Sequence, residues 1–117
     1  MKVAILMGSP RDGDKMAGAS EMLERFDVPH EVHVMSAHRT PEKVAELASN
    51  AREDGYGVII CGAGMAAHLP GVVAAMTPIP VIGVPIKASL DGLDVAAEVK
   101  DQTNPGLMVC TTTFQEG

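Results

Sequence analysis

The feature that most constrains the fold of this chain is a set of five short apolar segments, spaced at similar intervals along its 117 residues. They occupy residues 3–7, 31–35, 58–61, 81–84 and 107–110. Four are continuously apolar, which is typical of strands buried on both faces of a parallel sheet. The second alternates polar and apolar residues, which favours an edge strand with one face in water.

Between these segments, apolar residues recur every three or four positions in residues 16–26 and 44–51, which predicts amphipathic helices. Thr40 is expected to be the N-cap of the second helix, with Pro41 at its first position and Gly55 at its end. Further helices are expected at about residues 66–75 and 93–100.

This alternation predicts one α/β domain over residues 1–117. We expect a three-layer α/β/α fold with a doubly wound parallel sheet of about five strands, flavodoxin-like or Rossmann-like.

The composition argues against several classes of protein. A net charge of −6 and an aromatic content of 3% do not fit a surface for nucleic acid. No apolar run approaches the ~18 residues of a membrane span, and the first residues do not resemble a signal peptide. Cys61 and Cys110 lie in apolar runs, so we expect buried thiols in a reducing compartment, the cytoplasm.

Four loops are expected to meet where the parallel strands end, because every strand-to-helix loop of such a sheet emerges at the same edge. They cover residues 8–12, 36–39, 62–68 and 85–92. Glycines in the first and third loops let backbone approach a ligand. No Walker sequence is present, and residues 62–67 follow only the weaker GxGxxA variant of the dinucleotide pattern.

His38 and its neighbours are the strongest candidates in these loops. A histidine can move protons near neutral pH, so His38 is either a general acid/base or a residue that merely bonds the loop backbone. Ser36 and Arg39 together suit phosphate oxygens, because a hydroxyl and a guanidinium both donate to them.

Other polar residues leave two interpretations open. Ser9 could bind phosphate or cap a helix, Asp12 could bind ribose hydroxyls or cap the same helix, and His68 could be structural or part of the site. A Ser-His-Asp triad is conceivable but lacks the Gly-x-Ser-x-Gly elbow. No HxH, HExxH or CxxC pattern exists, so we expect no metal site.

Several of these segments resemble the signature loops of the PurE family, the N5-carboxyaminoimidazole ribonucleotide mutases of purine biosynthesis. The matching segments are SAHRTP at residues 36–41, GAGxAAHLPG at 62–71, MGSxxD at 7–12, PVIGVP at 80–85 and LxGLD at 90–94. They occur in the same order, and the resemblance covers roughly residues 3–94. The intact SAHR and GAG segments are more similar to the bacterial mutase class than to the animal-type carboxylases.

The resemblance implies an isomerase that needs no metal or cofactor and forms a homo-octamer. It would move a carboxylate from N5 to C4 of the ribonucleotide by decarboxylation and recarboxylation, with His38 as general acid/base. It also implies a set of substrate-binding residues: Ser9, Asp12, Ser36, Arg39, Gly62, Ala63, Gly64, His68 and Leu69.

The chain also departs from the family pattern. Arg11 stands where the family usually has a second serine, and Met65 stands where it usually has glycine. The usual C-terminal helix, which packs against neighbouring subunits, is expected to be absent. Two alternatives therefore stay open: a non-catalytic module that binds a phosphorylated metabolite, and a related carboxylase with another substrate.

Overall fold

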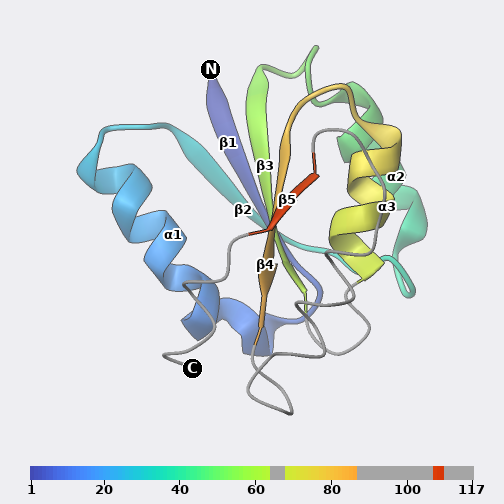
Figure 1. Cartoon of the computed structure of the whole chain (residues 1–117), viewed down its shortest axis with the longest axis horizontal. Coiled ribbons are helices and arrows are strands. Elements are labelled where there is room, and N and C mark those ends of the chain that lie inside the picture. The colour runs from blue at the N-terminus through green and yellow to red at the C-terminus, as the bar shows by residue number, and fades with distance from the viewer. Residues whose placement is uncertain (64–67, 87–106, 110–117) are drawn as a thin grey trace.

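A computed structural model describes residues 1–63, 68–86 and 107–109 of the chain (Figure 1). Its helices and strands follow one another as β1 (Lys2–Met7), η1 (Pro10–Asp12), α1 (Gly13–Arg25), β2 (His30–Val34), α2 (Pro41–Asn50), β3 (Tyr56–Ala63), α3 (His68–Met76), β4 (Val81–Pro85) and β5 (Leu107–Val109). The helix expected at residues 93–100 lies outside the described residues. Within the described part, no helix is long and apolar enough to span a membrane.

The strands form one sheet in the order β2-β1-β3-β4-β5, and every neighbouring pair is parallel. This order is the flavodoxin-like one, in which the direction of winding reverses between β1 and β3. The predicted α/β class is confirmed, and β2 is the edge strand that its alternating sequence indicates. Ligands of such folds bind outside the carboxyl ends of the strands near that reversal.

Helices cover both faces of the sheet, α1 on one and α2 with α3 on the other (Figure 1). Successive residues of β1 supply both cores: Ile5 packs with Met16 of α1, whereas Leu6 packs with Val44 of α2. Ile5 and Leu6 are both fully buried, as the continuously apolar sequence of this strand predicts. Packing of the three layers holds the strands in position, and the strands in turn position the loops that follow them.

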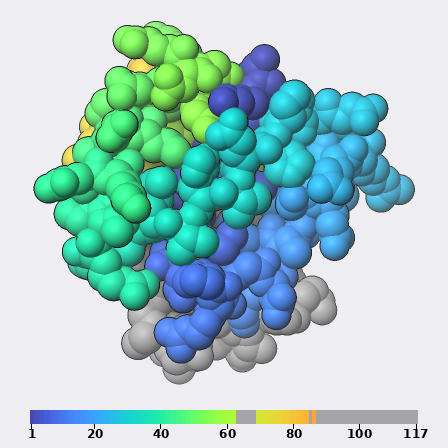
Figure 2. Space-filling model, turned by 180° about the vertical axis from the view of Figure 1, so that it is seen from behind, coloured from blue at the N-terminus to red at the C-terminus, as the bar shows by residue number. Residues whose placement is uncertain are grey.

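The edge strand β2 runs along the surface between α1 and α2 when the molecule is seen from behind (Figure 2). Val32 and Val34 remain about half exposed, at 51% and 48%. The alternating sequence of β2 therefore reflects its edge position. Even its two valines are only partly covered, so neither face of the strand is fully buried.

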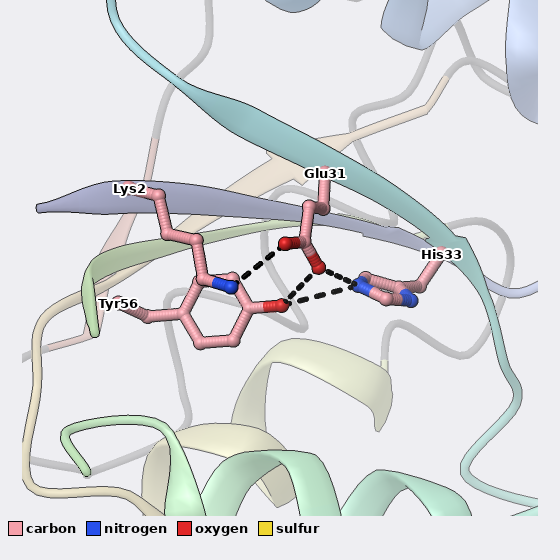
Figure 3. A network of polar contacts seen from close by, with 4 residues as sticks. All are labelled: Lys2, Glu31, His33 and Tyr56. Atoms are coloured by element: carbon pink, nitrogen blue, oxygen red, sulfur yellow. Dashed lines mark hydrogen bonds and ion pairs between the residues drawn. The ribbon is translucent and has the colours of Figure 1, made fainter. Parts of the chain in front are cut away.

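Four polar side chains join β1, β2 and β3 (Figure 3). Lys2 and Tyr56 begin β1 and β3, whereas Glu31 and His33 are the second and fourth residues of β2. Glu31 accepts hydrogen bonds from Lys2 Nζ at 2.7 Å and from the Tyr56 hydroxyl at 2.6 Å, and His33 Nε2 lies 3.3 Å from the same carboxylate. Lys2 and Tyr56 together lower the pKa of Glu31 to about 2. Burial, followed by the bond to Glu31, raises the pKa of Tyr56 to about 12. Lys2 and Tyr56 lie at the opposite end of their strands from the loops discussed next.

Candidate active site

The loops after β1 and β2 lie side by side because the two strands pair along their whole length. Met35 N donates to Met7 O at 2.9 Å, which extends the pairing one residue beyond β2. Arg39 then reaches across, and its Nη2 donates to Gly8 O at 3.0 Å. Two segments far apart in the sequence are thereby held as one surface.

Ser36 organises the second loop through its side chain. Its Oγ accepts hydrogen bonds from the backbone N–H groups of His38 and Arg39, each at 3.2 Å. A hydroxyl has two acceptor lone pairs and one proton to donate. Because both of these bonds use its acceptor capacity, the hydroxyl proton is the group that Ser36 can offer to a ligand, and a donor suits an anion. His38 itself is exposed.

Thr40 occupies the predicted N-cap position of α2, but its side chain bonds elsewhere. It precedes α2, and its carbonyl accepts the helical bond from Val44 N at 3.2 Å, but its side chain caps no helical N–H. Instead, its Oγ1 accepts from Ser36 N at 2.8 Å and donates to Ser36 O at 3.2 Å. The predicted N-cap position is therefore confirmed, but the side chain makes no capping bond, because its hydroxyl bonds two backbone groups of Ser36 instead. Pro41 does occupy the first helical position.

Ser9 and Asp12 flank the short helix η1. Ser9 is its N-cap, and its Oγ accepts from Arg11 N at 3.3 Å, so the capping interpretation of Ser9 holds for η1 rather than for α1. Asp12 occupies the N-cap position of α1 without a side-chain capping bond. Both are half-buried, and Arg11 is exposed.

The third loop is described only at its two ends. Gly62 is buried, and the space that a Cβ would fill is taken by Met16 Sδ and Ile86 Cδ1, at 2.7 and 2.9 Å. Ala63 ends β3, His68 begins α3, and Leu69 is buried in the core under α2 and α3. Gly64 and Met65 lie outside the described residues. Any larger residue at position 62 would therefore require the ends of the Met16 and Ile86 side chains to shift, independently of any ligand.

A surface pocket of about 290 Å³ opens between the first two loops. Its described lining is Gly8, Pro10, Val34, Met35, Ser36, Arg39 and Thr40. Ser36 and Arg39 are the two predicted site residues among them. Nothing in the sequence pointed to Val34 or Met35 as lining residues, whereas the Ser-x-x-x-Thr spacing around His38 was a usable signal for Thr40.

A second pocket, of about 320 Å³, lies between β2 and α2 beside Tyr56 and His33. It is slightly larger, but its charged lining mixes Lys43 with Glu46 and Asp54 and shows no preference for one ligand. We therefore place the candidate site at the loops. Among the described residues, no three His, Cys, Asp or Glu side chains are grouped to hold a metal ion. Cys61 is fully buried, and burial raises the pKa of its thiol, so it offers no nucleophile.

Comparison with known proteins decides the family. Residues 2–114 match the family model described as AIR carboxylase. The chain belongs to the AIR carboxylase family. The resemblance to PurE proteins inferred from the loop motifs is thereby confirmed.

Similar proteins carry two related names. The chain is 58% identical to an N5-carboxyaminoimidazole ribonucleotide mutase of Vibrio vulnificus, covering 99% of this chain and 72% of that one. It is 55% identical to the mutase of Pyrococcus abyssi, over 94% of this chain and 63% of the relative. It is also 60% identical to a chloroplastic phosphoribosylaminoimidazole carboxylase of Vigna aconitifolia, but over 79% of this chain and only 17% of that longer one. The chain thus spans less than two thirds of the length of some of the relatives it matches.

A solved structure agrees on the fold. The crystal structure of Treponema denticola PurE superimposes with a TM-score of 0.80, covering 92% of this chain and 70% of that one, at 24% sequence identity.

Proposed function

We propose that this chain is an N5-carboxyaminoimidazole ribonucleotide mutase, which moves a carboxylate from N5 to C4 of the ribonucleotide. The names of several relatives in the family support the reaction. The observation that carries the proposal in this molecule is the hydrogen bond from Arg39 to Gly8 O, because it joins two loops around a pocket that offers donors to a phosphate.

His38 is the proposed general acid/base. In the first step the bond between N5 and the carboxylate breaks, carbon dioxide forms, and His38 supplies the proton that N5 takes up. In the second step C4 attacks the retained carbon dioxide, and His38 removes the C4 proton. The proton gained equals the proton lost, so no other reactant is needed. The bond from His38 N to Ser36 Oγ supports this role, because it ties the backbone of His38 to a residue that lines the pocket.

The phosphoribosyl group is assigned to the first two loops. The Ser36 hydroxyl can donate one bond to a phosphate oxygen, and the Arg39 guanidinium carries five N–H donors, one of which bonds Gly8 O. Ser9 and Asp12, which flank η1 in the first loop, are assigned to the same group. The roles of Gly62, Ala63, Gly64, His68 and Leu69 in lining the base and carboxylate pocket belong to the proposal as well.

The proposal also includes assembly and compartment. We expect a homo-octamer in the cytoplasm, with sites between subunits and no cofactor. Light scattering tests the assembly, and a monodisperse monomer would overturn it.

The decisive experiment supplies the N5-carboxylated ribonucleotide, with ¹³C in its carboxylate, to the purified chain without metal or cofactor. Carbon-13 NMR then follows the label from N5 to C4. Appearance of the C4 isomer above the uncatalysed rate supports the mutase. Saturable binding with no isomer formed supports the non-catalytic binding module instead.

A carboxylase is the second candidate, because the Vigna aconitifolia relative carries that name at 60% identity. A carboxylase would use the uncarboxylated aminoimidazole ribonucleotide with bicarbonate as its source of carbon. The same NMR assay separates the two: incorporation of ¹³C-bicarbonate at C4, with no conversion of the N5-carboxylated compound, would favour the carboxylase.

A further inference from the structure

The loop that carries His38 is closed into a ring by the Thr40 side chain together with one backbone hydrogen bond. Three hydrogen bonds join its ends, Ser36 and Thr40: Ser36 N to Thr40 Oγ1 at 2.8 Å, Thr40 Oγ1 to Ser36 O at 3.2 Å, and Thr40 N to Ser36 O at 2.9 Å. The Thr40 hydroxyl both accepts and donates, so it takes part in two of the three. A hydroxyl can do both at once, whereas an aliphatic side chain of the same shape can do neither.

The ring leaves the intervening residues little freedom. Inside it, Ser36 Oγ accepts from the N–H groups of His38 and Arg39. Met35 is buried just before the ring, and Ala37 packs against the core under α2. The backbone around the exposed His38 is therefore fixed on both sides, by packing before it and by the Thr40 hydroxyl after it.

We propose that Thr40 is a positioning residue, whose hydroxyl holds His38 and Ser36 in place for the reaction. This inference rests on the proposed function for its kinetic consequence, although the ring itself does not depend on the reaction. Reaction rates are sensitive to such placement, since an error of about 1 Å in a catalytic group can cost on the order of a hundredfold in rate.

A structural role alone would give a different result. If Thr40 only started α2, then its loss would lower the stability of the helix and leave the folded enzyme fully active. The structure argues against that role, because the Thr40 side chain makes no capping bond to α2.

The test compares Thr40→Val, which keeps the shape but loses the hydroxyl, with Thr40→Ser, which keeps the hydroxyl. We expect Thr40→Val to lower kcat by about 10- to 100-fold while KM changes by less than about fivefold. Thr40→Ser should retain at least about a third of kcat. Wild-type kcat in Thr40→Val, or equal loss in both variants, would overturn the proposal.

Thr77 provides a matched control. Its Oγ1 is buried without a hydrogen-bond partner among the described residues, so Thr77→Val removes a hydroxyl that holds nothing there. We expect kcat within twofold of wild type and equal or higher stability. A drop in kcat comparable to that of Thr40→Val would show that loss of any such hydroxyl impairs the enzyme, and would overturn the assignment to Thr40.

A second measurement separates failure of this inference from failure of the proposed function. Amide hydrogen exchange at His38 and Arg39, followed by NMR without substrate, reports the ring directly. Exchange should be at least tenfold faster in Thr40→Val than in wild type and restored in Thr40→Ser, even if the chain proves to have no mutase activity. Should Thr40→Val not fold, Thr40→Ala takes its place. Unchanged exchange in the folded variant would overturn the ring's role.

Discussion

Arg39 Nη2 donates a hydrogen bond of 3.0 Å to Gly8 O, and this bond links the loop after β2 to the loop after β1. These two loops follow neighbouring strands of the sheet, β2 and β1, whose carboxyl ends meet at one edge. The guanidinium is planar and carries its donors in a fixed fork, so holding one of them on Gly8 O orients the others. Arg39 therefore has a structural partner and a proposed ligand at once.

Replacing Arg39 by lysine should weaken ribonucleotide binding by about tenfold to a hundredfold, because a point charge cannot bond Gly8 O and a phosphate in the same plane. The free energy of unfolding should fall by less than about 1 kcal/mol, since the side chain is exposed. Isothermal titration with the aminoimidazole ribonucleotide measures the first effect. Arg52→Lys, in the exposed turn after α2, is the control and should bind like wild type. Wild-type affinity in Arg39→Lys would contradict the assignment.

His38→Asn should abolish mutase turnover while ribonucleotide binding stays within about tenfold of wild type. An asparagine side chain can still form hydrogen bonds but cannot carry a proton between N5 and C4. Single-turnover kinetics together with titration separate the two effects. His30→Asn changes a histidine at the other end of β2 and should keep turnover within about twofold. Full turnover by His38→Asn would remove the residue from the mechanism.

The sequence was sufficient to predict the strands because both faces of the central ones are buried, whereas their order in the sheet came from the structure. Ile5 and Leu6 point to opposite cores and are both fully buried, so an unbroken apolar run is the pattern that such a strand must have. The edge position of β2 was equally visible in its alternation.

The details of the site were harder to predict, because one residue type can serve two partners. The Thr40 hydroxyl can bond forward to a helical N–H or backward to Ser36, and the sequence does not say which geometry the chain adopts. Gly62 suggested a close approach to a ligand, but the space beside it is filled by Met16 and Ile86. Those contacts come from other elements and become visible only once the chain is folded.

Glu31 should make the stability of the fold depend on acid. Its pKa is about 2 in the folded chain and 4.5 ordinarily, so between these values the unfolded state binds a proton that the folded state does not. The stability that this group contributes is therefore present above about pH 4.5 and is lost as the pH falls toward 2.

Glu31→Gln removes this charge and should lower Tm at pH 7 by roughly 2 to 5 °C, with the difference from wild type shrinking steadily as the pH falls from about 4.5 toward 2. Circular dichroism melts from pH 7 downward measure both. Glu21→Gln removes the same charge from an exposed position on α1 and should leave Tm within about 1 °C. A constant difference between Glu31→Gln and wild type at every pH would contradict the network as its source.

Gly62→Ala should lower the free energy of unfolding by about 1 to 3 kcal/mol, because its new methyl group would lie 2.7 Å from Met16 Sδ and 2.9 Å from Ile86 Cδ1. Met16→Ala alone should cost about 2 to 5 kcal/mol, since this side chain is buried under α1. The double variant should be more stable than the sum of the two losses predicts, by about 1 kcal/mol, because the truncated side chain leaves room for the methyl group. Urea unfolding measures all three.

Gly18→Ala, on the exposed face of α1 with nothing within 4 Å of the added carbon, should instead stabilise the chain by about 0.5 to 1 kcal/mol. Strictly additive losses at positions 16 and 62 would mean that Met16 is not what requires glycine there.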